Sequence, residues 1–337
     1  MKKAVIFGII VALLLLVGGF LVFKAVVQNK SPLLSPLVIK AINAFPDPTK
    51  PKVPASDLAN KDIVNILLIG IDRRSKDETS FRSDTMILLS INTKNKRAVL
   101  TSVPRDLWVG GGRINALYAS QGYEGIKNEF YKLTGQMADR YILTDFADFT
   151  WIVDAMDGVP VNVVNTFTDT EFPVDATLGY QTVTFTQGTE KLTGDRAIIY
   201  ARSRHGNNGE GSDFMRQRRQ HQILVGMLSA VLQPKSIFNP MVVENALKTV
   251  TTGRMETNIS LADANFLWSF YKDKDLYKIE SLYLESPDVF NPPMSDYGGA
   301  WVLIPTDPTN ATFSTKVKNA LLGIVDSSQS TASQSSN

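Results

Sequence analysis

The sequence has no cysteine and only two histidines, His205 and His221, among its 337 residues. Disulfide bridges, thiolate chemistry, iron–sulfur clusters and Cys/His zinc sites are therefore excluded. Any bound metal would have to be held by carboxylates, which favours a hard cation such as magnesium or manganese. A Ser-His-Asp triad is not favoured either, because both histidines lie in an arginine-rich stretch that would repel a protonated imidazole. We expect them to be solvated or to contact phosphate.

The sequence also lacks an excess of charge of either sign. Its 35 basic and 33 acidic residues give a formal net charge of +2, which argues against a protein that coats nucleic acid over its whole surface. With 44% apolar and 20% charged residues the composition is that of an ordinary globular protein. Any basic site should be local, and we expect no nucleic-acid partner.

The two ends of the chain differ in composition from the middle. Residues 4–23 carry no charge and are long enough, at about 1.5 Å per residue, to cross a bilayer, which predicts a membrane anchor within 1–27. Lysines on both sides leave its orientation open. The prolines of 28–60 predict an extended stalk, and the Ser- and Gln-rich residues 326–337 predict a disordered tail. The folded domain is then 61–325.

Within this domain, short apolar runs at 65–71, 86–91 and 97–103 predict three strands. Their connections are too short for parallel crossovers, so we expect an antiparallel meander. Helical patterns and further strands alternate after it. We predict helices at 114–134, 146–156, 214–232, 260–272 and 311–323, and strands at 141–144, 159–164 and 277–284. The fold class is therefore α/β, a mixed central β-sheet sandwiched by helices.

The meander collects charged side chains at one edge of the sheet. The first strand ends at Asp72, the second begins near Asp84, and the third is followed by Arg105 and Asp106. With Arg74 and Arg82 these residues should form one rim. Carboxylates suit a divalent cation, and guanidinium groups suit phosphate. A network of salt bridges at the strand ends explains the spacing equally well.

A second group of charges is strongly basic. Five arginines lie within eighteen residues, with only Glu210 and Asp213 to offset them. They are Arg202, Arg204, Arg216, Arg218 and Arg219. Ser212 or Asp213 is the expected N-cap of the next helix, so several arginines fall near the positive end of its dipole. That placement makes sense if an anion binds there; the alternative is a solvated basic face.

One face of this helix should carry Arg216, Arg219, Gln220 and Ile223, so it begins polar and continues apolar. Aromatic residues also recur near helical spacing between 118 and 151. They fit either an ordinary core or a slot for an acyl or isoprenoid chain, and the sequence does not separate the two.

Six short motifs, in order, resemble the LytR-CpsA-Psr family of membrane-anchored enzymes that attach anionic glycopolymers to peptidoglycan. They are Asn-Ile-Leu-Leu-Ile-Gly-Ile-Asp-Arg-Arg at 65–74, Arg-Ser-Asp-Thr-Met at 82–86, Val-Pro-Arg-Asp at 103–106, Arg-Ile-Asn-Ala at 113–116, Tyr-Ala-Arg-Ser-Arg at 200–204 and Asp-Phe-Met-Arg-Gln-Arg-Arg-Gln at 213–220. The resemblance implies a LytR-CpsA-Psr-like (LCP-like) catalytic domain with an apolar pocket for a polyprenyl chain.

The resemblance also implies roles for individual residues. Asp72 and Asp84 correspond to a magnesium-binding pair, and Arg105 and Asp106 to catalytic groups. The groups implied to bind pyrophosphate are Arg74, Arg82, Arg105, Arg202, Arg204, Arg216, Arg219 and Gln220. Two positions depart from the family pattern, Arg73 and Met215, where the family tends to have small residues. Neither departure removes an implied contact.

The function implied is transfer of a glycopolymer, such as teichoic acid or capsular polysaccharide, from an undecaprenyl-diphosphate carrier to peptidoglycan. The implied location is the cell membrane, with a single pass and an extracytoplasmic catalytic domain. Asp106 or a metal-bound carboxylate would deprotonate the attacking hydroxyl, unless Asp106 only orients Arg105. Two alternatives stay open: a polyprenyl-diphosphate pyrophosphatase, and a non-enzymatic polyprenyl-phosphate-binding regulator resembling a transcription attenuator.

Overall fold

The computed structural model describes residues 55–73, 81–174, 179–231, 256–260, 262–263, 266–267 and 276–324. Several predicted segments lie outside the described residues: the membrane anchor, most of the stalk, most of the 260–272 helix, and the tail. In the part of the chain that is described, no helix is long and apolar enough to cross a membrane.

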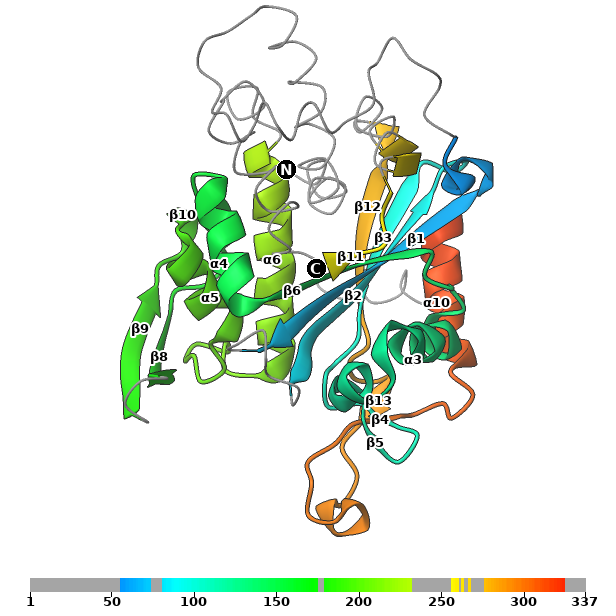
Figure 1. Ribbon diagram of the computed structural model, residues 1–337. Coiled ribbons are helices and arrows are strands. Elements are labelled where there is room, and N and C mark those ends of the chain that lie inside the picture. Colours follow the sequence, from blue (N-terminus) through cyan, green and yellow to red (C-terminus); the bar gives the residue numbers. More distant parts are fainter. Residues whose placement is uncertain are drawn as a thin grey trace, which may run out of the picture. The chain divides into compact units, whose positions relative to one another are not determined.

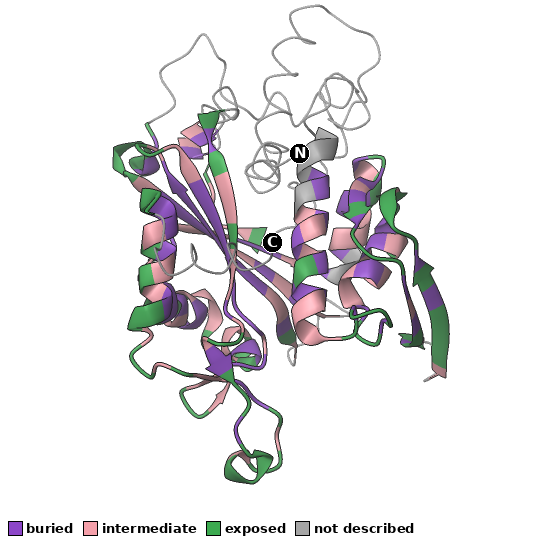
Figure 2. Cartoon of the chain, turned by 180° about the vertical axis from the view of Figure 1, so that it is seen from behind, coloured by how far each residue is buried: buried purple, intermediate pink, exposed green. Residues whose placement is uncertain are grey.

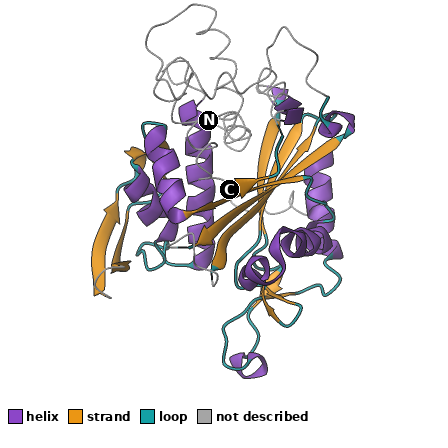
Figure 3. Ribbon diagram, viewed as in Figure 1, coloured by secondary structure: helices purple, strands orange, loops and turns teal. Residues whose placement is uncertain are grey.

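Two compact units alternate along the sequence. The first draws on residues 55–60, 69–81 and 142–275, and the second on 61–68, 82–141 and 276–324. The largest sheet has six strands (Figures 1 and 3). Their order is β11 (Glu256–Thr257), β6 (Arg140–Asp145), β1 (Ile63–Asp72), β2 (Arg82–Asn92), β3 (Arg97–Ser102) and β12 (Lys278–Tyr283). The predicted order of the first three strands is confirmed.

The sheet strands of the second unit are mixed in direction. β2 pairs antiparallel with β3, as predicted, with Ile87 opposite Ser102. β12 pairs with β3 in parallel, so the sheet is mixed. β2 and β3 are buried along most of their length (Figure 2), which explains why their sequences are continuous apolar runs rather than alternating ones.

Two predicted helices belong to this unit. α10 (Ala311–Leu322) packs on β3 and on α3 (Leu117–Thr134), and α3 also contacts β2. The predicted 114–134 helix begins as a short 3-10 turn, η2 (Ile114–Ala116), and is interrupted at Gly122, whose φ of 64° lies in the left-handed region. Positive φ angles are accessible to glycine without steric cost, so the kink sits where the sequence permits it.

Short elements complete the second unit. A hairpin joins β4 (Trp108–Val109) to β5 (Gly112–Arg113) through Gly110 and Gly111, both with positive φ. Later in the chain, β13 (Val289–Phe290) pairs antiparallel with β14 (Ile304–Pro305), and η4 (Met294–Tyr297) lies between them in sequence. The Leu303 amide donates to the Asp106 carbonyl oxygen, which fixes this late segment to the end of the third strand.

The first unit contains the predicted helix α4 (Phe146–Ala155), strand β7 (Val159–Val163) and helix α6 (Asp213–Val231), preceded by η1 (Asp57–Asn60). Among the described residues of this unit, four strands and a helix were not predicted: β8 (Phe167–Val174), β9 (Gly179–Phe185), β10 (Gly188–Leu192), the two-residue strand β11, and α5 (Gly194–Arg202). β8 pairs antiparallel with β9, and β10 with β7. β9 is mostly exposed (Figure 2), so it lacks the apolar run that marks a buried strand.

The long helix of this unit packs tightly. α6 contacts β7 and α5, and a Cβ added at Gly226 would lie 2.2 Å from the Pro160 carbonyl oxygen. Glycine at this position therefore lets the helix approach the strand backbone. This close approach fixes the position of α6, whose first turns carry the basic residues singled out in the sequence.

Candidate functional site

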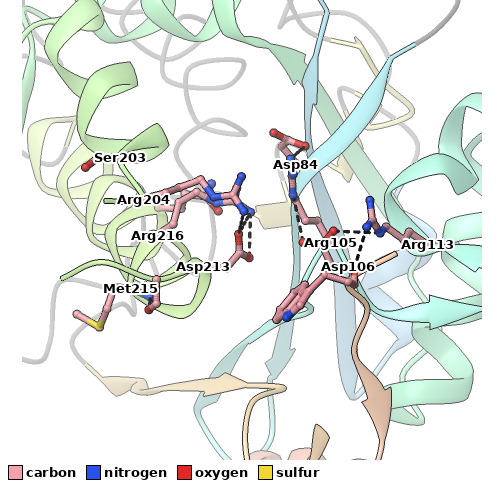
Figure 4. A network of polar contacts seen from close by, with 12 residues as sticks. Asp84, Arg105, Asp106, Arg113, Ser203, Arg204, Asp213, Met215 and Arg216 are labelled. Carbon is pink, nitrogen blue, oxygen red and sulfur yellow. Dashed lines mark hydrogen bonds and ion pairs between the residues drawn. The ribbon is translucent and has the colours of Figure 1, made fainter. Parts of the chain in front are cut away.

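A chain of ionic contacts in the second unit starts from Arg105, which follows β3. Its Nη1 donates to Asp84 Oδ1 at 2.6 Å, and its Nε lies 3.4 Å from Asp106 Oδ2 (Figure 4). The side chains of Arg105 and Asp84 are 15% and 14% exposed, so this pair is only partly screened by solvent. The antiparallel pairing of β2 and β3 brings these groups to one sheet edge, as predicted.

Arg113 extends this chain. Its Nε lies 3.4 Å from Asp106 Oδ1, and its Nη2 donates to the Trp301 carbonyl oxygen at 2.8 Å. The β4–β5 hairpin returns the chain to this position, and the Asn115 amide donates to the Arg105 carbonyl oxygen at 3.2 Å. Arg113 belongs to one of the six motifs but was not predicted as a site residue. The spacing of residues in the sequence does not show that the β4–β5 hairpin brings Arg113 back to Asp106.

Asp106 therefore lies between two guanidinium groups, and its side chain is only 6% exposed. A carboxylate that is buried and paired on both oxygens is suited to holding arginines in place. This geometry supports the orienting role for Asp106 over the role of general base.

A second ionic group in the first unit surrounds the start of α6. Ser212 Oγ accepts from the Met215 amide at 3.1 Å, so Ser212 is the N-cap, one of the two predicted candidates. Asp213 Oδ1 lies 2.9 Å from Arg216 Nη2 and 3.3 Å from Arg204 Nη2 (Figure 4). The Arg216 side chain is 4% exposed, and that of Arg204 is 41% exposed.

This group lies at the start of α6. Two arginines share one carboxylate at the positive end of a helix dipole, where cations are disfavoured unless an anion is near. Asp213 offsets part of that cost. The exposed Arg204 head group suits binding of an anionic ligand such as phosphate. Gln220, one turn beyond Arg216, donates to the Ala201 carbonyl oxygen at 3.4 Å, and Arg218 is exposed on another face.

Residues 40–319 match the model of the LytR_cpsA_psr family, which is more than half of the chain. The chain belongs to the LytR_cpsA_psr family. It is 29% identical over 271 residues to the Bacillus cereus protein named polyisoprenyl-teichoic acid–peptidoglycan teichoic acid transferase TagU, with 77% of this chain and 81% of the relative covered. The protein of the same name from Oceanobacillus iheyensis is 32% identical over 245 residues, with 68% and 70% covered.

Solved structures support the same fold. B. subtilis TagV matches with a TM-score of 0.59 and 24% identity, covering 77% of this chain and 98% of TagV. TagT bound to LIIa-WTA matches with a TM-score of 0.56 and 23% identity, covering 80% of this chain and 94% of TagT. The mixed α/β fold with a central mixed sheet is therefore that of LytR_cpsA_psr proteins.

Several site residues implied by this family are placed at the ends of strands or helices. Asp72 is the last residue of β1, and Arg82, the first residue of β2, is exposed. Arg202, the last residue of α5, has its guanidinium carbon 5.7 Å from the Phe172 ring centroid. Arg74 lies outside the described residues. Among the residues that are described, no three His, Cys, Asp or Glu side chains gather as a metal site.

Arg219, which is also implied to bind pyrophosphate, is buried in this structure. Its side chain is 1% exposed, and it donates hydrogen bonds to Glu210 and to backbone carbonyls within the first unit. A direct diphosphate contact would require breaking these bonds. Helical spacing shows which residues share a face and does not show whether that face is buried, so the sequence did not reveal this burial. The role of Arg219 at the diphosphate stays a prediction.

The two histidines differ from each other. His205 is exposed, as expected, and lies 3.6 Å from Glu171. His221 is buried, and burial lowers the pKa of its imidazole to about 3, so the expectation of a solvated or phosphate-contacting side chain is wrong for this residue. Its position on the inner side of α6 makes it a neutral core residue.

Proposed function

We propose that this protein transfers an anionic glycopolymer from an undecaprenyl-diphosphate carrier to a hydroxyl group of a peptidoglycan sugar. Membership of the LytR_cpsA_psr family carries the proposal, together with relatives named as polyisoprenyl-teichoic acid–peptidoglycan teichoic acid transferases. The two arginine–carboxylate groups support it because diphosphate transfer needs fixed positive charge where negative charge grows.

In this proposal Arg105 acts on the reacting phosphate. Asp84 and Asp106 hold its guanidinium at 2.6 and 3.4 Å, so its orientation is set before a substrate arrives. In transfer the acceptor hydroxyl oxygen forms a bond to the sugar-linked phosphorus as the bond between that phosphorus and the bridging oxygen breaks. The hydroxyl proton passes to a carboxylate of the site or to solvent, and the lipid phosphate leaves with the bridging oxygen. An oriented guanidinium beside it stabilises this charge without reorganising solvent.

The arginines beside α6 bind the diphosphate. Arg204 and Arg216, with Arg202 and Gln220, supply guanidinium and amide donors for its oxygens. Asp213 holds the guanidinium groups of Arg204 and Arg216 in place. Arg82 and Arg74 are proposed to add further contacts.

We also propose that Asp72 and Asp84 hold Mg²⁺, or Mn²⁺. Asp84 also accepts a hydrogen bond from Arg105 through its Oδ1. Two carboxylates completed by water and by substrate phosphate oxygens are a usual magnesium environment. When bound, the ion would supply charge neutralisation on the diphosphate.

Residues 4–23 are proposed to anchor the protein in the cell membrane, with the domain from 61 onward outside the cell. The carrier lipid and peptidoglycan would then both be accessible. A protease-accessibility assay at a cleavage site introduced in the exposed Gly110–Gly111 turn tests this orientation: cleavage in intact protoplasts is expected, and protection until lysis would refute it.

The activity is tested with a short lipid-diphosphate-linked glycopolymer, with and without peptidoglycan. The expected product is polymer covalently attached to peptidoglycan, formed only with wild-type protein and magnesium. Polymer released at an equal rate without peptidoglycan would show a pyrophosphatase, and no turnover despite lipid binding would favour the regulator. Asp84→Ala should abolish transfer, whereas the matched control Asp62→Ala, which removes an exposed ion pair with Lys94, should not.

A further inference from the structure

We propose that two buried charged residues of the first unit, Arg219 and Asp169, are positioning residues that fix the backbone of Arg204 from opposite sides. The inference rests on the proposed function, because Arg204 is taken to bind the diphosphate. Neither residue would touch the ligand. Arg219 is 1% exposed and Asp169 is fully buried.

Arg219 caps the end of the helix that leads to Arg204. The last carbonyls of a helix have no intrahelical donor and need another partner. Arg219, on α6, supplies it: its Nε donates to the Tyr200 carbonyl oxygen at 3.1 Å, and its Nη2 donates to the carbonyl oxygen of Ser203, the residue after α5. A cation also suits the negative end of the α5 dipole.

Asp169 holds the same segment through its amide groups. Its Oδ2 accepts from Ser203 Oγ at 2.6 Å and from the amides of Arg204 and His205, both at 3.1 Å. Burial alone would raise the pKa of this carboxyl, but these hydrogen bonds and one from the Glu171 amide lower it. Asp169 is thus held as a carboxylate.

One peptide unit is therefore held at both ends. The carbonyl oxygen of Ser203 accepts from Arg219, and the N–H of the same peptide unit, which belongs to Arg204, donates to Asp169. The plane of a peptide bond is rigid, so fixing both of its polar atoms fixes the direction in which the Arg204 side chain leaves the backbone. The Arg204 head group itself is exposed and has an ion pair with Asp213.

Arg219 also connects this segment to the start of α6. Its Nη1 donates to Glu210 Oε2 at 2.8 Å and to the Glu210 carbonyl oxygen at 3.1 Å, just before the N-cap Ser212. Its guanidinium carbon lies 4.9 Å from the Phe167 ring centroid. A buried charge is costly unless it is paired and hydrogen-bonded. Here the cost is offset by bonds that join the two segments bearing Arg204 and Arg216.

The test compares Arg219→Lys, Arg219→Met and Asp169→Asn with wild-type protein, each measured well below its own unfolding temperature. Two properties are followed: the Kd for geranylgeranyl diphosphate, and hydrogen exchange at the Arg204 and His205 amides without ligand. The matched control is Val161→Ala, which removes packing from the fully buried core of β7 in the same unit. We expect Arg219→Met and Asp169→Asn to raise the Kd at least tenfold and to speed exchange at these two amides. Arg219→Lys should recover part of the binding, and Val161→Ala should change only the unfolding temperature.

The inference would be overturned if all four variants had a lower unfolding temperature but kept Kd values within twofold of wild type and unchanged exchange at these amides. Arg219 and Asp169 would then have a merely structural role. Failure of the proposed function has a different result. If wild-type protein did not bind the lipid diphosphate, the exchange of the Arg204 and His205 amides would still decide whether Asp169 and Arg219 hold this segment.

Discussion

His221 should make the stability of the protein fall in mildly acidic solution. The unfolded state binds a proton on this imidazole below its ordinary pKa of 6.5, whereas the folded state does so only near pH 3. Between these values the unfolded state holds more protons, so the free energy of unfolding decreases as pH falls. The stabilisation that the neutral His221 imidazole contributes is present above pH 6.5. Each unit of pH below that value removes roughly 1.4 kcal/mol, so about 2 kcal/mol of the free energy of unfolding should be lost at pH 5.

The measurement is urea denaturation of wild-type protein and His221→Gln between pH 5 and 8. The variant is expected to be less stable at pH 8, because it disturbs a packed core, but the difference between the two proteins should shrink by about 2 kcal/mol at pH 5. His205→Gln, which removes the exposed imidazole, controls for the loss of a histidine. Parallel stability curves for wild-type protein and His221→Gln would refute the assignment of a neutral buried imidazole.

Three further predictions concern the arginines and the packing of α6. Arg105→Ala should weaken binding of an isoprenyl diphosphate by about 1–3 kcal/mol, measured by titration calorimetry, and an unchanged Kd would remove Arg105 from the diphosphate site. Arg216→Ala should cause a loss of the same size, whereas Arg218→Ala, on an exposed face, should cause little; equal losses would indicate a diffuse basic surface. Gly226→Ala should lower the free energy of unfolding by about 1–3 kcal/mol because its Cβ meets backbone, while Gly112→Ala, with open space around it, should not, as thermal unfolding would show.

The sequence predicted those parts of the fold that depend on local pattern. Continuous apolar runs and short connections were sufficient for β2 and β3, and amphipathic periodicity for α3, α6 and α10. The parallel pairing of β12 with β3 was out of reach, because it joins residues far apart in the chain. β8, β9 and β10 were missed because many of their side chains face solvent and resemble loop residues.

For the site, the sequence predicted which charged side chains meet at the strand ends, but it did not reveal which residues of the helix are buried. Asp84, Arg105 and Asp106 meet because of strand direction, which short connections fix. The burial of Arg219 was not foreseen, because a buried arginine and a ligand-binding arginine have the same sequence signature. Glu210, one of the two acidic residues in this basic stretch, was the available signal, since a buried guanidinium needs a carboxylate close by.

The parallel pairing of β12 with β3 also constrains the order in which the chain can fold. Lys278 lies opposite Arg97, so the second unit closes a loop of about 180 residues. Before β12 and α10 have been synthesised, the outer edge of β3 exposes unpaired backbone groups beside an apolar surface, which is a template for aggregation. Contacts this distant slow folding, since the entropy of closure is lost before the contacts form. The nascent protein should therefore depend on a holding chaperone until residue 322 has emerged, and a chain stopped before residue 276 should aggregate even though the strands β2 and β3 are intact.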